Sequence, residues 1–112
     1  FVLWENSYNA EFIAPSVKEQ YVCYVPIDWH AAHFIRFSMA LHQATGQAVY
    51  LEKARAMADT LTAVQHPEGY YPTWMRRKGA GIDYSDIWPN CTSYTGEMLI
   101  KLGRYVEGLE RK

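Results

Sequence analysis

A chain of 112 residues is long enough for one domain with a modest core, and we treat residues 1–112 as a single helical domain. Its 11 basic and 12 acidic side chains nearly cancel, so no strong field favours nucleic acid or an anionic membrane as a partner. No apolar run approaches the roughly 18 residues that a membrane span needs.

The first 24 residues mix β-forming residues with breakers. Residues 1–4 and 21–25 favour strands, but asparagines and Pro15 interrupt the segment between them. We predict an irregular N-terminal arm with at most short strand-like pieces. Cys23 and Cys91 lack the spacing of a zinc site, and we favour two buried free thiols over a disulfide between arm and helix.

The next segment predicts a helix from Asp28 to about Thr45. Asp28 is the expected N-cap, because a short acidic side chain accepts hydrogen bonds from first-turn amides. Gly46 ends the helix, since glycine adopts the left-handed conformation without a Cβ clash. The apolar positions are numerous enough to predict a wide buried face: Phe34, Ile35, Phe37, Met39 and Leu41.

A second helix is predicted from about Ala48 to Gln65. Its apolar positions form a narrower stripe, typical of an outer helix that is covered on one side: Leu51, Ala54, Ala58, Leu61 and Val64. Together the two helices read as an antiparallel αα-hairpin.

Residues 66–90 form a connection of about 25 residues, far longer than the usual 2 to 8 between helices. Loops of this length are functional or disordered, and the aromatic content of this one favours order. Within it, Arg76, Arg77 and Lys78 form a basic turn. We interpret the turn as solvated, in preference to a site for a substrate carboxylate.

A third helix follows, with Asn90 or Thr92 as its expected cap. Its apolar stripe comprises Met98, Leu99, Leu102, Tyr105, Val106 and Leu109. Gly96 should cost about 1 kcal/mol relative to alanine, so close backbone packing or a ligand is its expected reason. The predicted fold class is therefore all-α, a hairpin plus a third helix.

This arrangement resembles a known family. Ala-Thr-Gly at 44–46, Tyr-Leu-Glu-Lys-Ala at 50–54 and Pro-Glu-Gly-Tyr-Tyr-Pro-Thr-Trp at 67–74 look like the α/α toroid of the six-hairpin glycosidase group, and the resemblance covers residues 22–105. It implies a ring in which the first and third helices are inner and the second is outer. It also implies a carbohydrate cleft formed by the loops that precede inner helices, and a periplasmic or secreted location.

A full ring of that family has six hairpins, and this chain supplies about one and a half. We expect its partners to be a carbohydrate and either the remainder of the ring or further copies of the chain. The start at Phe1 instead of methionine also suggests an excised piece of a longer protein.

The candidate catalytic residues are Asp28 and Asp86, because each precedes an inner helix in the resemblance. Glycoside hydrolysis uses two carboxyl groups, one to protonate the leaving oxygen and one to attack or to activate water. The alternative roles are an N-cap for Asp28 and turn residues for Asp83 and Asp86. Glu97 is a weaker candidate.

Aromatic residues near these segments are the candidate substrate-binding residues, because aromatic faces cover the C–H faces of sugars. The set, with one histidine, is Tyr24, Trp29, His30, Tyr70, Tyr71, Trp74, Tyr84 and Trp88. Alternatively these rings bury the long loop, and Trp74 and Trp88 are then the expected core-facing pair. His30 and His33 share a helix face but lack a third ligand, so we predict no metal and no other cofactor.

The sequence thus predicts part of a carbohydrate-active enzyme, a glycoside hydrolase acting on a polysaccharide or oligosaccharide. A polysaccharide lyase of the same architecture is an alternative, since a tyrosine near a histidine can remove the proton beside a uronic carboxylate. A non-catalytic helical packing or binding module is the other. No nucleophile elbow or phosphate-binding glycine loop is present.

Overall fold

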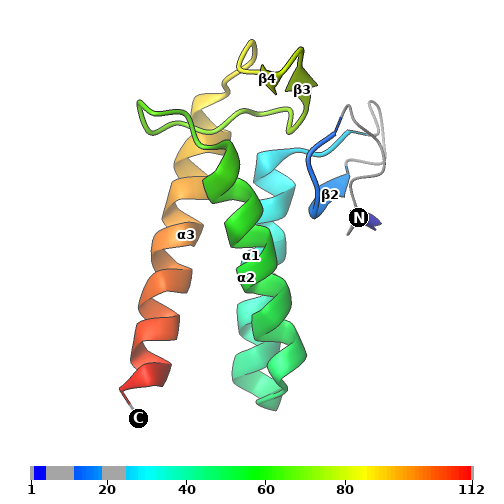
Figure 1. Cartoon of the computed structure of the whole chain (residues 1–112). Coiled ribbons are helices and arrows are strands. Elements are labelled where there is room, and N and C mark those ends of the chain that lie inside the picture. Colours follow the sequence, from blue (N-terminus) through cyan, green and yellow to red (C-terminus); the bar gives the residue numbers. More distant parts are fainter. Residues whose placement is uncertain (1, 5–11, 19–24, 112) are drawn as a thin grey trace.

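The computed structural model describes residues 2–4, 12–18 and 25–111, and this part of the chain is mainly helical (Figure 1). The helices are α1 (Asp28–Thr45), α2 (Ala48–Val64) and α3 (Pro89–Glu110). Prediction of a helical hairpin followed by a third helix is confirmed. None of the described helices has the length and apolar composition that crossing a membrane requires.

Helices α1 and α2 pack along their length as a hairpin with a very short turn (Figure 1). Gly46 ends α1 in the left-handed conformation at φ 70°, and its N–H donates to the His42 carbonyl at 2.7 Å. The sequence predicts this helix end from the glycine alone, and the predicted end of α1 at Thr45 is correct. Helix α2 ends one residue before the predicted position.

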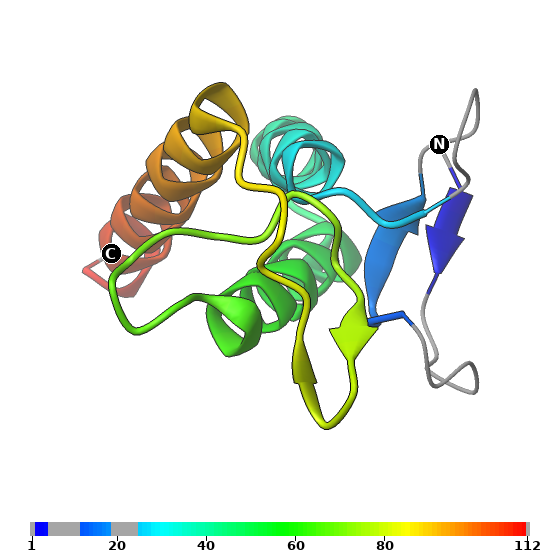
Figure 2. The same ribbon diagram turned by 90° about the horizontal axis from the view of Figure 1, so that it is seen from above.

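Helix α3 packs mainly against α1 and makes little contact with α2. Seen from above in Figure 2, α1 lies beside both of the other helices, and α2 and α3 are the more widely separated pair. Because α3 is long and has one principal neighbour, much of its surface stays open to solvent.

The expected helix caps are wrong. Asp28 is the first residue of α1, and the N-cap is Ile27, which makes no side-chain capping bond. For α3 the N-cap is Trp88, followed directly by Pro89, so neither Asn90 nor Thr92 caps it. Proline suits the first helical position because its missing N–H needs no partner there.

Four short strands accompany the helices in the described residues. Antiparallel pairs join β1 (Val2–Trp4) to β2 (Ser16–Lys18), and β3 (Arg77–Lys78) to β4 (Gly81–Ile82). Strand β1 agrees with the strand-like piece predicted at residues 1–4, whereas β2 forms just after Pro15, where no strand was expected. The second pair belongs to the long connection, where no strand was expected either. Cys23 and Tyr24 lie outside the described residues.

Backbone hydrogen bonds fix the long connection to the segment before α1. Ile13 N–H donates to the Met75 carbonyl at 2.9 Å, and Met75 N–H donates to the Pro26 carbonyl at 3.0 Å. Ile27 and Trp74 form a further antiparallel bridge. The connection is therefore ordered by pairing with a distant segment, as well as by its aromatic rings.

The core lies between α1 and α2 and extends to the arm, the connection and α3. It comprises Ile13, Val17, Ala31, Ile35, Ala54, Met57, Leu61, Val64, Tyr71, Met75 and Leu102. The wide buried face predicted for α1 is wrong at Phe37, which is 62% exposed. Phe37 therefore does not belong to the core. Cys91 is a buried free thiol, as the sequence favoured.

Candidate functional site

The starts of α1 and α3 meet around Thr73. The Asp28 N–H donates to the Thr73 carbonyl at 3.1 Å, and the Trp88 N–H donates to its Oγ1 at 2.9 Å. Thr73 N–H in turn donates to the Asp86 carbonyl at 3.1 Å. The structure therefore brings the segments carrying the two candidate carboxylates together, and a buried threonine from the long connection joins them.

The Asp28 carboxyl group is completely buried at this junction. Thr95 Oγ1 donates to Asp28 Oδ2 at 2.9 Å, while Oδ1 has no hydrogen-bond partner among the described residues. Burial raises the pKa of Asp28 from 3.8 to about 7, because a charged carboxylate loses hydration there, and the bond from Thr95 opposes this rise. Asp28 therefore carries a proton over much of the acidic range.

The second candidate carboxylate, Asp86, is exposed. Trp74 Nε1 donates to Asp86 Oδ2 at 2.9 Å, and the rings of Trp74 and Trp88 meet edge to face with centroids 5.7 Å apart. Trp88 is 49% exposed, so the alternative in which it faces the core is wrong. Its ring meets the half-buried Trp74 at the surface of the molecule. We call these three side chains the indole–carboxylate surface.

A second aromatic group lies on the first turns of α1 and α3. The Tyr94 hydroxyl lies 3.2 Å from His33 Nδ1, and the ring of Trp29 meets the His33 ring edge to face at 4.0 Å. Trp29 is 38% exposed and also contacts the half-buried His30. Burial lowers the pKa of His33, and the charge of Arg36 lowers it further.

The remaining predicted aromatic residues lie apart from these groups, near the end of α2. Tyr70 stacks on His66 with centroids 4.3 Å apart, and the Tyr84 hydroxyl donates to the Val64 carbonyl at 2.7 Å. Tyr71 is 6% exposed and belongs to the core. The described members of the predicted substrate-binding set are therefore divided among four places: the indole–carboxylate surface, the aromatic group around Trp29, the group at the end of α2 and the core.

The basic turn is only partly solvated. Arg76 Nε lies 2.7 Å from Asp83 Oδ2, while Arg77 and Lys78 are exposed on β3. Asp83 Oδ1 accepts hydrogen bonds from the Ser85 backbone and hydroxyl. Those bonds, with the one from Arg76, hold the pKa of Asp83 below its ordinary range. Asp83 is thus a turn residue, one of the roles that the sequence indicated.

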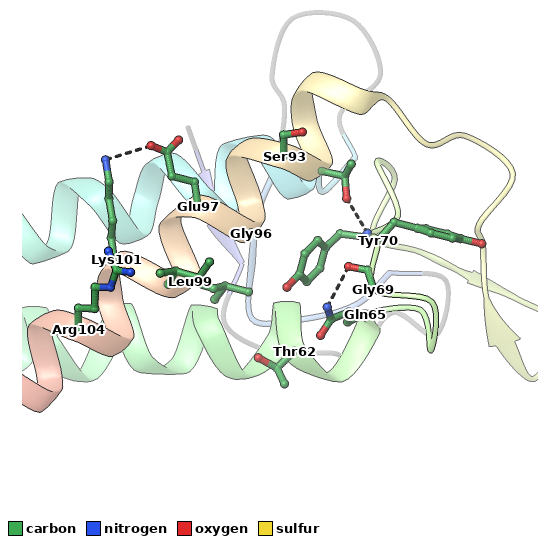
Figure 3. Close-up of a pocket in the computed structure, with 13 residues that line it drawn as sticks. Thr62, Gln65, Gly69, Tyr70, Ser93, Gly96, Glu97, Leu99, Lys101 and Arg104 are labelled. Carbon is green, nitrogen blue, oxygen red and sulfur yellow. Dashed lines mark hydrogen bonds and ion pairs between the residues drawn. The ribbon is translucent and has the colours of Figure 1, made fainter.

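A groove of about 1080 Å³ lies between α2 and α3, next to the turn that follows α2 (Figure 3). Its walls include Thr62 from α2, Gln65 just after α2, and Gly96, Leu99 and Arg104 from α3. Sequence reasoning did not predict this groove. The only sequence feature that pointed to this groove was Gly96, because a residue without a side chain leaves open space beside the helix.

Sequence reasoning also missed Thr73, Thr95 and Tyr94. Thr95 lies 67 positions from Asp28, and Tyr94 lies 61 positions from His33, so no local pattern links them. The described residues contain no group of three or more His, Cys, Asp or Glu side chains arranged to hold a metal ion.

Together these features define a mainly helical protein whose helix starts carry exposed indole rings beside a carboxylate. Scans against protein-family models and searches of curated proteins and solved structures give no match to the chain.

Proposed function

We propose that the chain is part of a carbohydrate-active enzyme of the α/α toroid type, and that it contributes to glycoside hydrolysis. The indole–carboxylate surface carries the proposal, since it combines the exposed Asp86 with the half-exposed ring of Trp88. An indole face covers the C–H face of a sugar, while a carboxylate accepts bonds from its hydroxyls. In this proposal a polysaccharide or oligosaccharide lies across the starts of α1 and α3.

The two carboxyl groups differ in the way that acid–base hydrolysis requires. Asp28, with its pKa near 7, retains the proton that a general acid must donate to the leaving oxygen. Asp86 is exposed and is the residue that would attack the sugar or activate water. Since Asp28 is covered, proton delivery from it requires the side chains above it to move. Asp86 and Trp88 are therefore the residues expected to touch the glycan.

Replacement of Trp88 with alanine should weaken glycan binding by about tenfold or more, because a large apolar contact is worth roughly 1.5–3 kcal/mol when fully covered. Quenching of tryptophan fluorescence across a panel of neutral and acidic polysaccharides, checked by calorimetry, measures this. The matched control is Phe37→Ala. Phe37 is more exposed than Trp88 but lies in the middle of α1, outside the indole–carboxylate surface. Equal binding by both variants and the parent would exclude the indole–carboxylate surface.

Turnover separates an enzyme from a binding module. Asp86→Asn keeps an oxygen that can accept the Trp74 bond but cannot ionise, so it should retain glycan binding and lose release of reducing ends. Because the chain supplies only about one and a half hairpins of the proposed ring, turnover is measured in the completed ring, where binding without turnover would favour the non-catalytic helical module.

One observation favours the lyase alternative. Tyr94 and His33 lie within hydrogen-bond reach beside the exposed Trp29, the pairing that removes a proton next to a uronic carboxylate. A lyase leaves an unsaturated uronate at the new chain end, which absorbs ultraviolet light, whereas a hydrolase does not. Loss of that absorbance in Tyr94→Phe would assign elimination to this pair.

A further inference from the structure

The solvent-facing side of α3 carries a seven-residue repeat centred on Ile100. Residues on either side of this centre form pairs, two glycines on one side of the face and two opposite charges on the other. Ser93, Ile100 and Glu107 lie in one line along the helix, since seven residues are nearly two turns. All three are exposed, and Ile100 is exposed by 58%. Gly96 and Gly103 flank this line on one side, and Glu97 and Arg104 flank it on the other.

Packing within the described residues does not require glycine at position 96 or position 103. A Cβ added at Gly96 would meet only Tyr71 Cε2, at 4.0 Å, and one added at Gly103 would meet nothing within 4 Å. Glycine nevertheless weakens a helix relative to alanine. Glycines that cost helix stability and are not required by close packing within the described residues suit the close approach of another backbone.

The two charges on the opposite side have opposite signs and are open to a partner. Glu97 forms an exposed pair with Lys101 at 3.2 Å, the kind of contact that contributes little (Figure 3). Arg104 makes no ion pair with the described part of the chain. Figure 3 shows Glu97, Lys101 and Arg104 along the rim of the groove beside Gly96.

We propose that this face binds the same face of a second copy of the chain, with the two α3 helices antiparallel. A two-fold axis beside Ile100 places Gly96 opposite the partner subunit's Gly103, and Glu97 opposite the partner subunit's Arg104. The same operation repeats both contacts on the other side of the axis. The glycines let the helices approach closely, the two isoleucines meet at the centre, and both charge contacts are attractive.

This self-association is weak and depends on concentration. A helix of 22 residues is about 33 Å long, and one helix pair buries less than the roughly 1,200–2,000 Å² of a stable interface. The inference rests on α3 alone and does not depend on the proposed function.

Sedimentation velocity of the full chain over a range of concentrations tests the proposal. The parent should show a monomer–dimer equilibrium, and Glu97→Arg and Arg104→Glu should each raise the dimer dissociation constant by tenfold or more. An equimolar mixture of these two variants should form dimers again, because every 97–104 contact then joins opposite charges. Glu52→Arg makes the same change of charge on α2 and should leave the equilibrium unchanged.

Gly103→Leu separates association from folding. The site is open and leucine favours helix, so the melting temperature should not fall, whereas the bulky side chain should abolish the dimer. A parent that stays monomeric at high concentration would overturn the proposal. So would failure of the mixed variants to form dimers, or dimers that persist in Gly103→Leu.

Discussion

The contribution of Asp28 to the free energy of unfolding should fall by about 4 kcal/mol as the pH rises from about 4 to about 8, because Asp28 is buried with a pKa raised from 3.8 to about 7. The folded state binds this proton more tightly than the unfolded state does. Its contribution is therefore complete below pH 4 and is lost as the pH approaches the folded pKa. Urea unfolding at intervals between pH 4 and pH 8 measures the change.

Asp28→Asn isolates the contribution of this one group. Its amide oxygen can still accept the Thr95 hydroxyl but carries no charge, so the variant should match the parent near pH 4 and exceed its stability by up to about 4 kcal/mol at pH 8. Comparison with the parent is needed because Asp83 and His33, whose pKa values are lowered, both contribute in the opposite direction at acidic pH. A stability difference that does not vary with pH would refute the assignment to Asp28.

Thr95→Val provides a second check on the same site. The hydrogen bond from Thr95 favours the charged form of Asp28, so its removal should raise the folded pKa further. The pH-dependent loss of stability should then extend to higher pH. If the profile does not move, Thr95 does not act through Asp28.

Ile35→Ala should destabilise the fold by about 2–5 kcal/mol, because it removes buried methyl groups and leaves a cavity that the helices fill only partly. Ile35 is fully buried in the core on α1. Domains of this kind have total stabilities of roughly 5–15 kcal/mol, so the loss is a large fraction. Thermal and urea unfolding, with the pH held fixed, measure it.

Phe37→Ala is the matched control on the same helix. Phe37 is 62% exposed, so truncation should change stability by only about 0.5 kcal/mol. A loss comparable to that of Ile35→Ala would mean that Phe37 is covered in solution, by another copy or by further helices.

Local sequence determined the helices and their main limits. Gly46 stops α1 because its backbone accepts a left-handed conformation, and this signal needs no distant partner. The stripe on α2 was also readable, and Ala54, Leu61 and Val64 are buried as its spacing predicts. The spacing of apolar residues along a helix shows which side of the helix packs against the core. It therefore predicts which side chains are buried even when the neighbouring element is unknown.

Tertiary structure alone decided the candidate site. Asp28 looked like an N-cap, but the connection from the far side of the chain supplies Thr73 for its backbone and α3 supplies Thr95 for its carboxyl group. Sequence left Trp88 open as a substrate-binding or a core-facing residue, and only the structure places the ring at the surface beside Trp74. Burial and pKa depend on which distant groups surround a side chain, and these contacts join positions more than 40 residues apart for Asp28. Apolar periodicity and capping patterns involve residues only a few positions apart, so they cannot predict contacts between such distant positions.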